Sequence, residues 1–212
     1  RRMNFEIAGK INGNFLIYKN VRNKNWISVL DNEMVEVSKV DQDYMPNDDR
    51  VINVDFFPYN DFVYLIYQYQ KKSIVYCMAA KIDGNGNKIG DVMTLDTTQL
   101  GFAANNKIYT VLSSEDKSKL IVFKINSKNR RNYMLTTVLL NDKLEQQKKS
   151  RMSIPMDDRD DQLGEFQLDN EGDLVFSKFQ TTSGDQISYA AFVIKYAQSD
   201  TLHFRNLSLA KL

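Results

Sequence analysis

The sequence predicts an all-β, β-propeller-like array of four four-stranded antiparallel blades, taken to be part of a larger propeller. One observation is an internal repeat: Met-Pro-Asn-Asp-Asp-Arg at residues 45–50 recurs as Ile-Pro-Met-Asp-Asp-Arg at residues 154–159, an offset of 159 − 50 = 109. A second is the alternation of turn signals with segments rich in aromatic and β-branched residues. A third is the start of each second strand near residues 15, 62, 119 and 173. Steps of about 50 residues are typical of four-stranded propeller blades.

The first two blades are predicted at residues 3–42 and 50–98. Strand-like segments of the first blade cover residues 5–11, 15–20, 26–30 and 34–40. Asn12-Gly13, the strongest two-residue hairpin signal in the chain, joins the first two of them. The second blade repeats the pattern at residues 51–57, 62–70, 73–82 and 90–95.

The third and fourth blades are predicted at residues 105–156 and 162–210. Their strand-like segments are residues 107–113, 119–125, 133–140 and 146–154, then residues 164–168, 173–180, 187–196 and 202–209. Residues 143–149 have helix propensity, but at the 109-residue offset they match residues 34–40, and this match favours a strand. At the same offset residues 29–33 fall on residues 138–142.

A sandwich of two packed sheets is the competing architecture. It gives no reason for a 109-residue repeat made of two similar units, so we expect a single propeller-like domain over residues 1–212. The first strand of each blade is expected nearest a common axis. Thirteen residues are expected to be largely buried: Phe15, Ile17, Trp26, Val29, Val63, Leu65, Val75, Ile121, Phe123, Leu135, Val175, Phe192 and Ile194.

Charge and composition exclude several classes of partner and site. Twenty-eight basic and 27 acidic residues give a net charge of +1, so no overall field draws the chain to nucleic acid or to an anionic membrane. No run approaches 18 apolar residues, so no membrane span is expected. Cys77 is the one cysteine, which excludes an intrachain disulfide, and His203 is the one histidine, which excludes a multi-histidine site.

The ends of the chain suggest a piece of a longer propeller. Arg1-Arg2 precedes the first strand about where Arg50 and Arg159 precede theirs. We therefore expect missing blades of the same polypeptide, or self-association, to cover the apolar flanks of the end blades. Closure of the four blades into a small ring is the rival outcome.

The twice-used connector motif supplies the candidate binding residues. Connectors between blades reach one common face of a propeller, which is where ligands are usually met. The structural alternative is that the proline stiffens a turn, the aspartates accept backbone N–H groups and the arginine bridges to the next blade. The residues concerned are Asp48, Asp49, Arg50, Asp157, Asp158 and Arg159.

Metal, cofactor and catalytic sites find little support. Residues 83–87, Asp-Gly-Asn-Gly-Asn, place oxygen ligands at alternate positions, but Lys88 and Thr94 stand where a calcium loop needs glycine and glutamate, so a hairpin turn is favoured. An acidic run could attract a cation by its charge, but Arg159 in the middle of the run opposes cation binding, so a solvated loop is favoured. The run consists of Asp157, Asp158, Asp160 and Asp161. Neither a metal nor a cofactor is predicted, and no catalytic residue is assigned.

Two hairpin-like runs carry a resemblance. Residues 168–176, Leu-Asp-Asn-Glu-Gly-Asp-Leu-Val-Phe, and residues 80–87, Ala-Lys-Ile-Asp-Gly-Asn-Gly-Asn, resemble the blade hairpins of uncharacterised β-propeller-like extracytoplasmic proteins of Bacteroidetes-type bacteria. The resemblance covers nearly the whole chain and implies the fold and an exported location, periplasmic, outer-membrane-associated or secreted. It implies no activity.

Three functions stay open at this point. The preferred one is a non-enzymatic propeller module that presents a rigid surface to a protein or glycan partner. A second is a glycan-processing enzyme that pairs Asp48 or Asp49 with Asp157 or Asp158 across the connector face. A third is a purely structural part of a larger assembly. Tyr44, Tyr59 and Tyr133 offer rings for stacking on sugars, although half-buried aromatics are ordinary in β-sheet cores.

Overall fold

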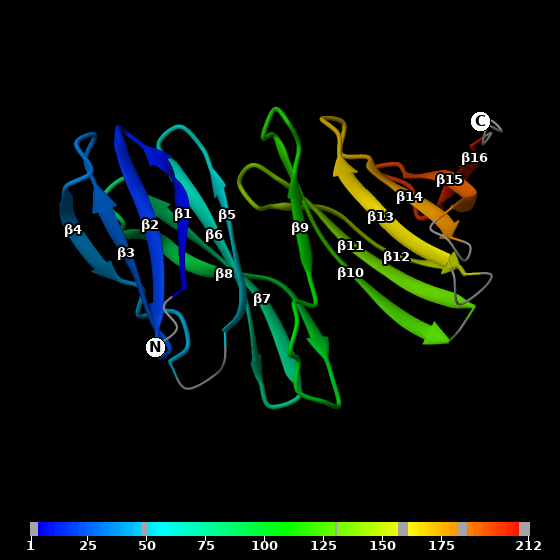
Figure 1. Cartoon of the computed structure of the whole chain (residues 1–212), viewed down its shortest axis with the longest axis horizontal. Coiled ribbons are helices and arrows are strands. Elements are labelled where there is room, and N and C mark those ends of the chain that lie inside the picture. The colour runs from blue at the N-terminus through cyan, green and yellow to red at the C-terminus, as the bar shows by residue number, and fades with distance from the viewer. Residues whose placement is uncertain (1–3, 48–50, 130, 157–160, 182–185, 208–212) are drawn as a thin grey trace. The chain divides into compact units, whose positions relative to one another are not determined.

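The computed structural model describes residues 4–47, 51–129, 131–156, 161–181 and 186–207, and within them it contains strands and turns but no helix. The chain divides into two compact units, unit 1 (Arg1–Ile108) and unit 2 (Tyr109–Leu212). Each unit holds two four-stranded antiparallel sheets (Figure 1). The predicted all-β class and its four four-stranded blades are confirmed. The single domain and the common axis stay predictions.

Every sheet is a meander whose strands pair in chain order. Unit 1 contains β1 (Asn4–Ile11), β2 (Asn14–Val21), β3 (Lys24–Leu30) and β4 (Glu36–Asp41), then β5 (Val51–Pro58), β6 (Phe62–Lys71), β7 (Ile74–Asp83) and β8 (Lys88–Gln99). Unit 2 contains β9 (Thr110–Ser113), β10 (Lys119–Asn129), β11 (Asn132–Asn141) and β12 (Gln146–Pro155), then β13 (Asp161–Leu168), β14 (Leu174–Thr181), β15 (Ile187–Lys195) and β16 (His203–Asn206).

A meander has two distinct ends. The turns between its first and second strands and between its third and fourth strands lie at one end, here called the hairpin end. The turn between its second and third strands lies at the other end together with the connector to the next sheet, and this is the connector end. Residues 143–149 form no helix: residues 143–145 belong to the turn after β11 and β12 begins at Gln146, so the predicted strand is confirmed for residues 146–149.

One turn recurs at the hairpin ends of both units. Asp31 closes it in the first sheet: its Oδ1 accepts the N–H groups of Glu33 and Val35 at 3.0 and 2.9 Å. Asp83 and Asn141 do the same between β7 and β8 and between β11 and β12. The hairpin turn predicted at residues 83–87 is therefore confirmed. The turn heads Asp31 and Asn141 lie 141 − 31 = 110 residues apart, one more than the offset of the sequence repeat.

The predicted Asn12-Gly13 hairpin is also present. Asn12 has φ 50° and Gly13 has φ 85°, the left-handed pair that a tight two-residue turn between twisted strands requires. Asparagine and glycine tolerate this conformation better than other residues, so the local sequence sets the register of β1 on β2 from the turn as far as the bulge between Ile7 and Gly9.

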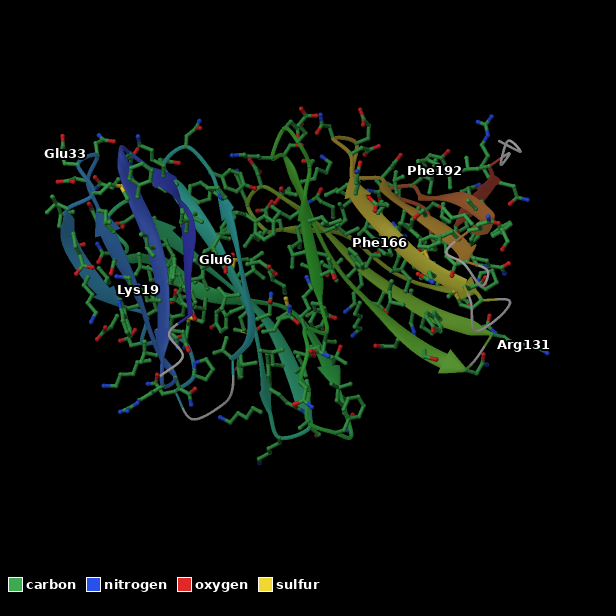
Figure 2. All side chains as sticks on the ribbon, in the orientation of Figure 1. Glu6, Lys19, Glu33, Arg131, Phe166 and Phe192 are labelled. Atoms are coloured by element: carbon green, nitrogen blue, oxygen red, sulfur yellow. The ribbon has the colours of Figure 1, made fainter. Side chains whose placement is uncertain are left out.

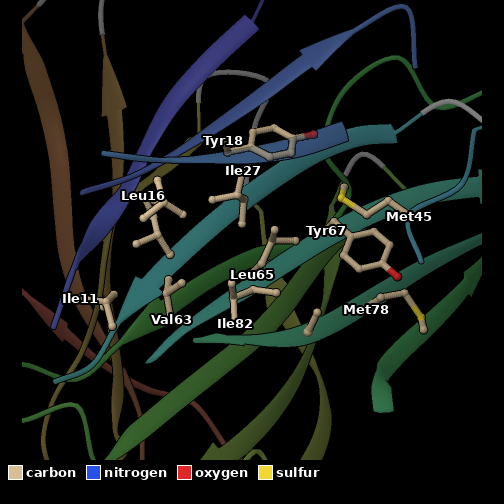
Figure 3. Packing of buried hydrophobic residues seen from close by; sticks show 13 residues of the cluster. Ile11, Leu16, Tyr18, Ile27, Met45, Val63, Leu65, Tyr67, Met78 and Ile82 are labelled. Atoms are coloured by element: carbon tan, nitrogen blue, oxygen red, sulfur yellow. The ribbon is translucent and has the colours of Figure 1, made fainter. Parts of the chain in front are cut away.

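The two sheets of unit 1 pack face to face over a continuous apolar layer (Figure 3). β1 lies against β5 and β6, so the first strands of the two sheets meet, as in neighbouring propeller blades. The rings of Tyr18 and Phe56 lie 5.5 Å apart across this layer. Its fully buried members include Ile11, Leu16, Ile27, Val63, Leu65 and Ile82.

Unit 2 repeats this arrangement. β9 contacts β13, so first strands meet here too. Phe166 stacks between Phe123 and Phe176, with ring centroids 4.9 and 4.8 Å away. The aromatic contacts join the two sheets of the unit into one core.

The expected core is correct in the second and third sheets along the chain and, except at Val29, shifted by one residue in the first and fourth. Seven of the thirteen residues are buried: Val29, Val63, Leu65, Val75, Ile121, Phe123 and Leu135. Phe15, Ile17, Trp26, Val175 and Ile194 are half-buried, and the prediction for Phe192 is wrong because its side chain is 39% exposed. The inward positions are instead their neighbours, such as Leu16, Ile27, Leu174, Phe176 and Val193.

The structure also describes the one cysteine and the one histidine of the chain. Cys77 is fully buried, and burial raises the pKa of its thiol far above the usual range. His203 lies exposed on β16, at the edge of its sheet. In the part of the chain that the structure describes, no helix has the length and hydropathy to cross a membrane.

Candidate functional site

A cleft of about 480 Å³ opens between the two sheets of unit 1 at their connector end. We call it the inter-sheet cleft. The start of β1, the end of β2, the turn after it and the start of β5 form its walls. Its lining residues are Phe5, Glu6, Tyr18, Asn20, Asn23, Val51, Ile52, Asn53 and Val54.

The cleft exists because the inward face of the first sheet changes from apolar to polar along its strands. Alternate residues of a strand share a face. On β2 the inward series runs from Leu16 through Tyr18 to Asn20, and on β1 it runs from Ala8 to Glu6. The apolar members close the layer toward the hairpin end. The polar members at the connector end keep the two sheets from sealing against each other.

Asn25 holds the polar side chains of this wall in place. Its Oδ1 accepts hydrogen bonds from the Tyr18 hydroxyl at 2.6 Å and from Asn20 Nδ2 at 2.7 Å, while its own Nδ2 donates to the Asn23 carbonyl at 3.3 Å. Asn25 is only 4% exposed, so these bonds form largely out of water. Burial, with a contribution from the nearby Glu6 charge, raises the pKa of Tyr18 far above its usual range, and the phenol stays neutral.

Glu6 is the one carboxylate among the residues that line the cleft. Partial burial raises its pKa, and the negative charge of Asp55 adds to the effect. No ion pair joins it to a lysine or arginine within the described ranges. Asp55 does not line the cleft and accepts a 2.8 Å hydrogen bond from Asn53 Nδ2. Figure 2 marks Glu6 on β1 and Glu33 at the opposite, hairpin end of the same sheet.

The opposite wall is the first half of β5. Its pairing with β6 skips Ile52, because Val51 pairs with Tyr69 and Asn53 with Gln68. Such a β-bulge bends a strand and is common next to binding sites. The four residues Val51 to Val54 all reach the cleft, although a regular strand would turn every second one away.

The six binding residues proposed from sequence, Asp48, Asp49, Arg50, Asp157, Asp158 and Arg159, lie outside the described residues, so their role stays a prediction. The chain continues directly from Arg50 into Val51, which lines the cleft. The predicted ligand-bearing end and the observed cleft are therefore at the same, connector end of unit 1.

Asp161, the last member of the acidic run, serves the core of unit 2. Its Oδ2 lies 3.0 Å from Lys178 Nζ, with both side chains almost fully buried. Gln180 Nε2 donates to Asp161 Oδ1 at 2.6 Å. Across the described ranges no three histidine, cysteine or acidic residues group as a metal site would require.

Sequence reasoning missed Glu6, Tyr18, Asn20 and Asn25. The sequence signal for this site is that β1, β2 and β3 each place a polar residue on the inward face near the connector end. The meander brings these three strands side by side, so the polar residues converge. The interpretation that put Phe15 and Ile17 inward assigned Tyr18 and Asn20 to the outer face, and so it hid this convergence.

Comparison with known proteins yields little. No family model matches the chain, and no curated protein matches it. Among solved structures, the β-propeller domain of Nup133 from Vanderwaltozyma polyspora is similar, with 10% sequence identity and a TM-score of 0.30. That match covers 97% of this chain and 55% of the other, so the chain spans about half the length of the structure it matches.

Proposed function

We propose that the chain is a non-enzymatic, propeller-type module that binds a protein or glycan partner through the connector end of unit 1. The observation that supports this is the inter-sheet cleft, in which the side chains of Tyr18 and Asn20 are held by hydrogen bonds to the buried Asn25. A site fixed in this way loses little side-chain entropy on binding, which favours affinity. The partner contacts would be made by Glu6, Asn20 and Asn23, with residues 51–54 as the opposite wall.

The chemistry of the cleft favours binding over glycoside hydrolysis. Hydrolysis of a glycosidic bond ordinarily needs two carboxyl groups that flank it. Of the residues that line the cleft, Glu6 alone carries a carboxyl group, and Asp55 stands outside the lining. The carboxylate pairs named from sequence lie outside the described residues, so the enzymatic alternative stays a prediction. The extracytoplasmic location stays a prediction that rests on the resemblance.

The test compares two single charge-neutral substitutions on one sheet. Glu6→Gln removes the cleft carboxylate, and Glu33→Gln removes an exposed carboxylate at the hairpin end. The whole chain is immobilised and presented both to a glycan array and to proteins of an extracellular or periplasmic fraction. We expect a ligand whose binding Glu6→Gln weakens and Glu33→Gln leaves unchanged. Equal binding by both variants to every captured ligand would refute the cleft as the binding site.

A further inference from the structure

We propose that the inter-sheet cleft takes a neutral saccharide residue of a glycan, whose hydroxyl groups bond to the Glu6 carboxylate and to the asparagine side chains. This inference rests on the proposed function and narrows its partner to one chemical class. The volume of the cleft, about 480 Å³, is within the range of roughly 300–1,000 Å³ typical of small-molecule sites.

The charges around the cleft argue against ionic ligands. An anion would meet the Glu6 carboxylate, with the negative charge of Asp55 close enough to act on Glu6. A cation would have to pass Arg22 and Lys24, whose exposed side chains flank Asn23 in the turn between β2 and β3. Like charges at a binding site disfavour association. A ligand without net charge avoids both penalties.

The polar lining also argues against an apolar ligand. Burying the side chains of Glu6, Asn20 and Asn23 against hydrocarbon would remove their water without replacing its hydrogen bonds, and this costs free energy. A hydroxyl group both donates and accepts hydrogen bonds, so a ligand with several hydroxyl groups replaces the hydrogen bonds that these side chains make to water.

The hydrogen bonds already made within the wall leave specific groups for such a ligand. Tyr18 donates its proton to Asn25 and also shares a side-chain hydrogen bond with Asn20, so its hydroxyl belongs to the wall's own network. Asn20 uses one N–H on Asn25, and within the described residues its carbonyl oxygen makes no further hydrogen bond. Glu6 adds two acceptor oxygens. The wall thus offers acceptor oxygens from Glu6 and Asn20 and an amide donor from Asn23, the mixture that adjacent sugar hydroxyls need.

The experiment uses the whole chain and neutral oligosaccharides of glucose, mannose, galactose and xylose, first on an array and then by calorimetric titration of the best ligand. We expect Glu6→Gln to weaken binding by about tenfold, because a charge-assisted hydrogen bond becomes a neutral one. Asn23→Gly removes a lining amide while keeping the positive φ of 63° acceptable, and it should also weaken binding. Glu33→Gln is the matched control and should bind as the unaltered chain does.

The pH dependence supplies a second readout. A saccharide held by the ionised Glu6 should bind less tightly as the pH falls through the pKa of that group. Because the pKa is raised, the loss should begin at a higher pH than for an ordinary glutamate. The Glu6→Gln variant should lack this dependence.

Several outcomes would overturn the inference. They are binding only of sulfated or uronic-acid glycans, binding only of a cation such as spermidine, no binding of any neutral oligosaccharide, or saccharide binding that neither Glu6→Gln nor Asn23→Gly changes. Capture of a protein whose binding depends on Glu6, in place of any saccharide, would refute the saccharide inference but would leave the proposed function standing. If neither proteins nor glycans depend on Glu6, both fail.

Discussion

Lys178 and Asp161 place two opposite charges inside unit 2, 3.0 Å apart, with side chains that are 3% and 0% exposed. Burying two charges costs much of what their attraction returns, so such a pair adds little net stability. Removing one partner is different, because it leaves the other charge buried without its main counter-charge. The stability of unit 2 at the start of β13 therefore depends on both residues being present.

We expect Lys178→Met to lower the free energy of unfolding of unit 2 by about 3–5 kcal/mol, the usual cost of breaking a buried ion pair by removing one of its members. Urea denaturation, monitored by far-UV circular dichroism, measures this loss of stability. The double variant Lys178→Met with Asp161→Leu should recover most of the loss, since no lone charge remains. A single variant that costs no more than the double one would contradict this account.

The residue scale also shows where sequence patterns lose information. Residues 15–18 are Phe-Leu-Ile-Tyr, apolar at every position, so alternation gives no preferred inward face. On β14 the charged Lys178 stands in the inward series with Leu174 and Phe176, and an inward charge favours the opposite phase. The errors on β2 and β14 arise in this way. In β6, where residues 63–68 are all buried, either phase gives correct core residues.

At the scale of elements, the turn between β7 and β8 packs onto the first sheet. Gln42 Nε2 donates to the Gly86 carbonyl at 3.0 Å. Gly86 has φ 82°, and a Cβ placed on it would lie 3.2 Å from Val29 and 3.3 Å from Val40. The turn therefore needs glycine at this position for two reasons, its backbone conformation and the close approach of the neighbouring sheet.

Substitution of two glycines separates the cost of the backbone conformation from the cost of the close approach to the first sheet. Gly90 has φ 67° but nothing within 4 Å of its added Cβ. Gly90→Ala should cost about 1–2 kcal/mol for the left-handed backbone alone. Gly86→Ala should cost a further 1–3 kcal/mol, roughly, for overpacking. Thermal or urea unfolding measures both, and equal losses in the two variants would show that the turn does not press on the first sheet.

The elements themselves were largely predictable from sequence, and the reason is local turn chemistry. Asn12-Gly13 and the turn headed by Asp83 fix their hairpins through residues that favour left-handed or side-chain-bonded backbone. The gapless repeat paired Asp31 with Leu140, yet the turn head in unit 2 is Asn141. Sequence identity aligned the connectors, while the side-chain oxygen that closes the turn sits one residue later, and only the hydrogen bonds reveal this.

At the scale of the whole molecule, the four meanders and their pairing within each unit follow from the repeat, but the site did not. The cleft depends on which face of β1 and β2 turns inward, and that phase was undetermined for residues 15–18. The connector motif precedes the end of unit 1 where the cleft lies, without naming Glu6 or Asn20, and the role of the motif itself stays a prediction. Self-association of the end sheets stays a prediction; Phe5 and Ile7 on β1 are 68% and 67% exposed.

The central claim is that the connector end of unit 1 is the binding surface. The most direct measurement is the mapping of backbone amide chemical shifts in the isotopically labelled chain during titration with the neutral oligosaccharide mixture. We predict the largest changes at residues 5–6, 18–23 and 51–54, with none at the hairpin-end turns of residues 31–35 and 83–87. Changes confined to the hairpin end or to unit 2, or no change at residues 5–6 and 51–54, would contradict it.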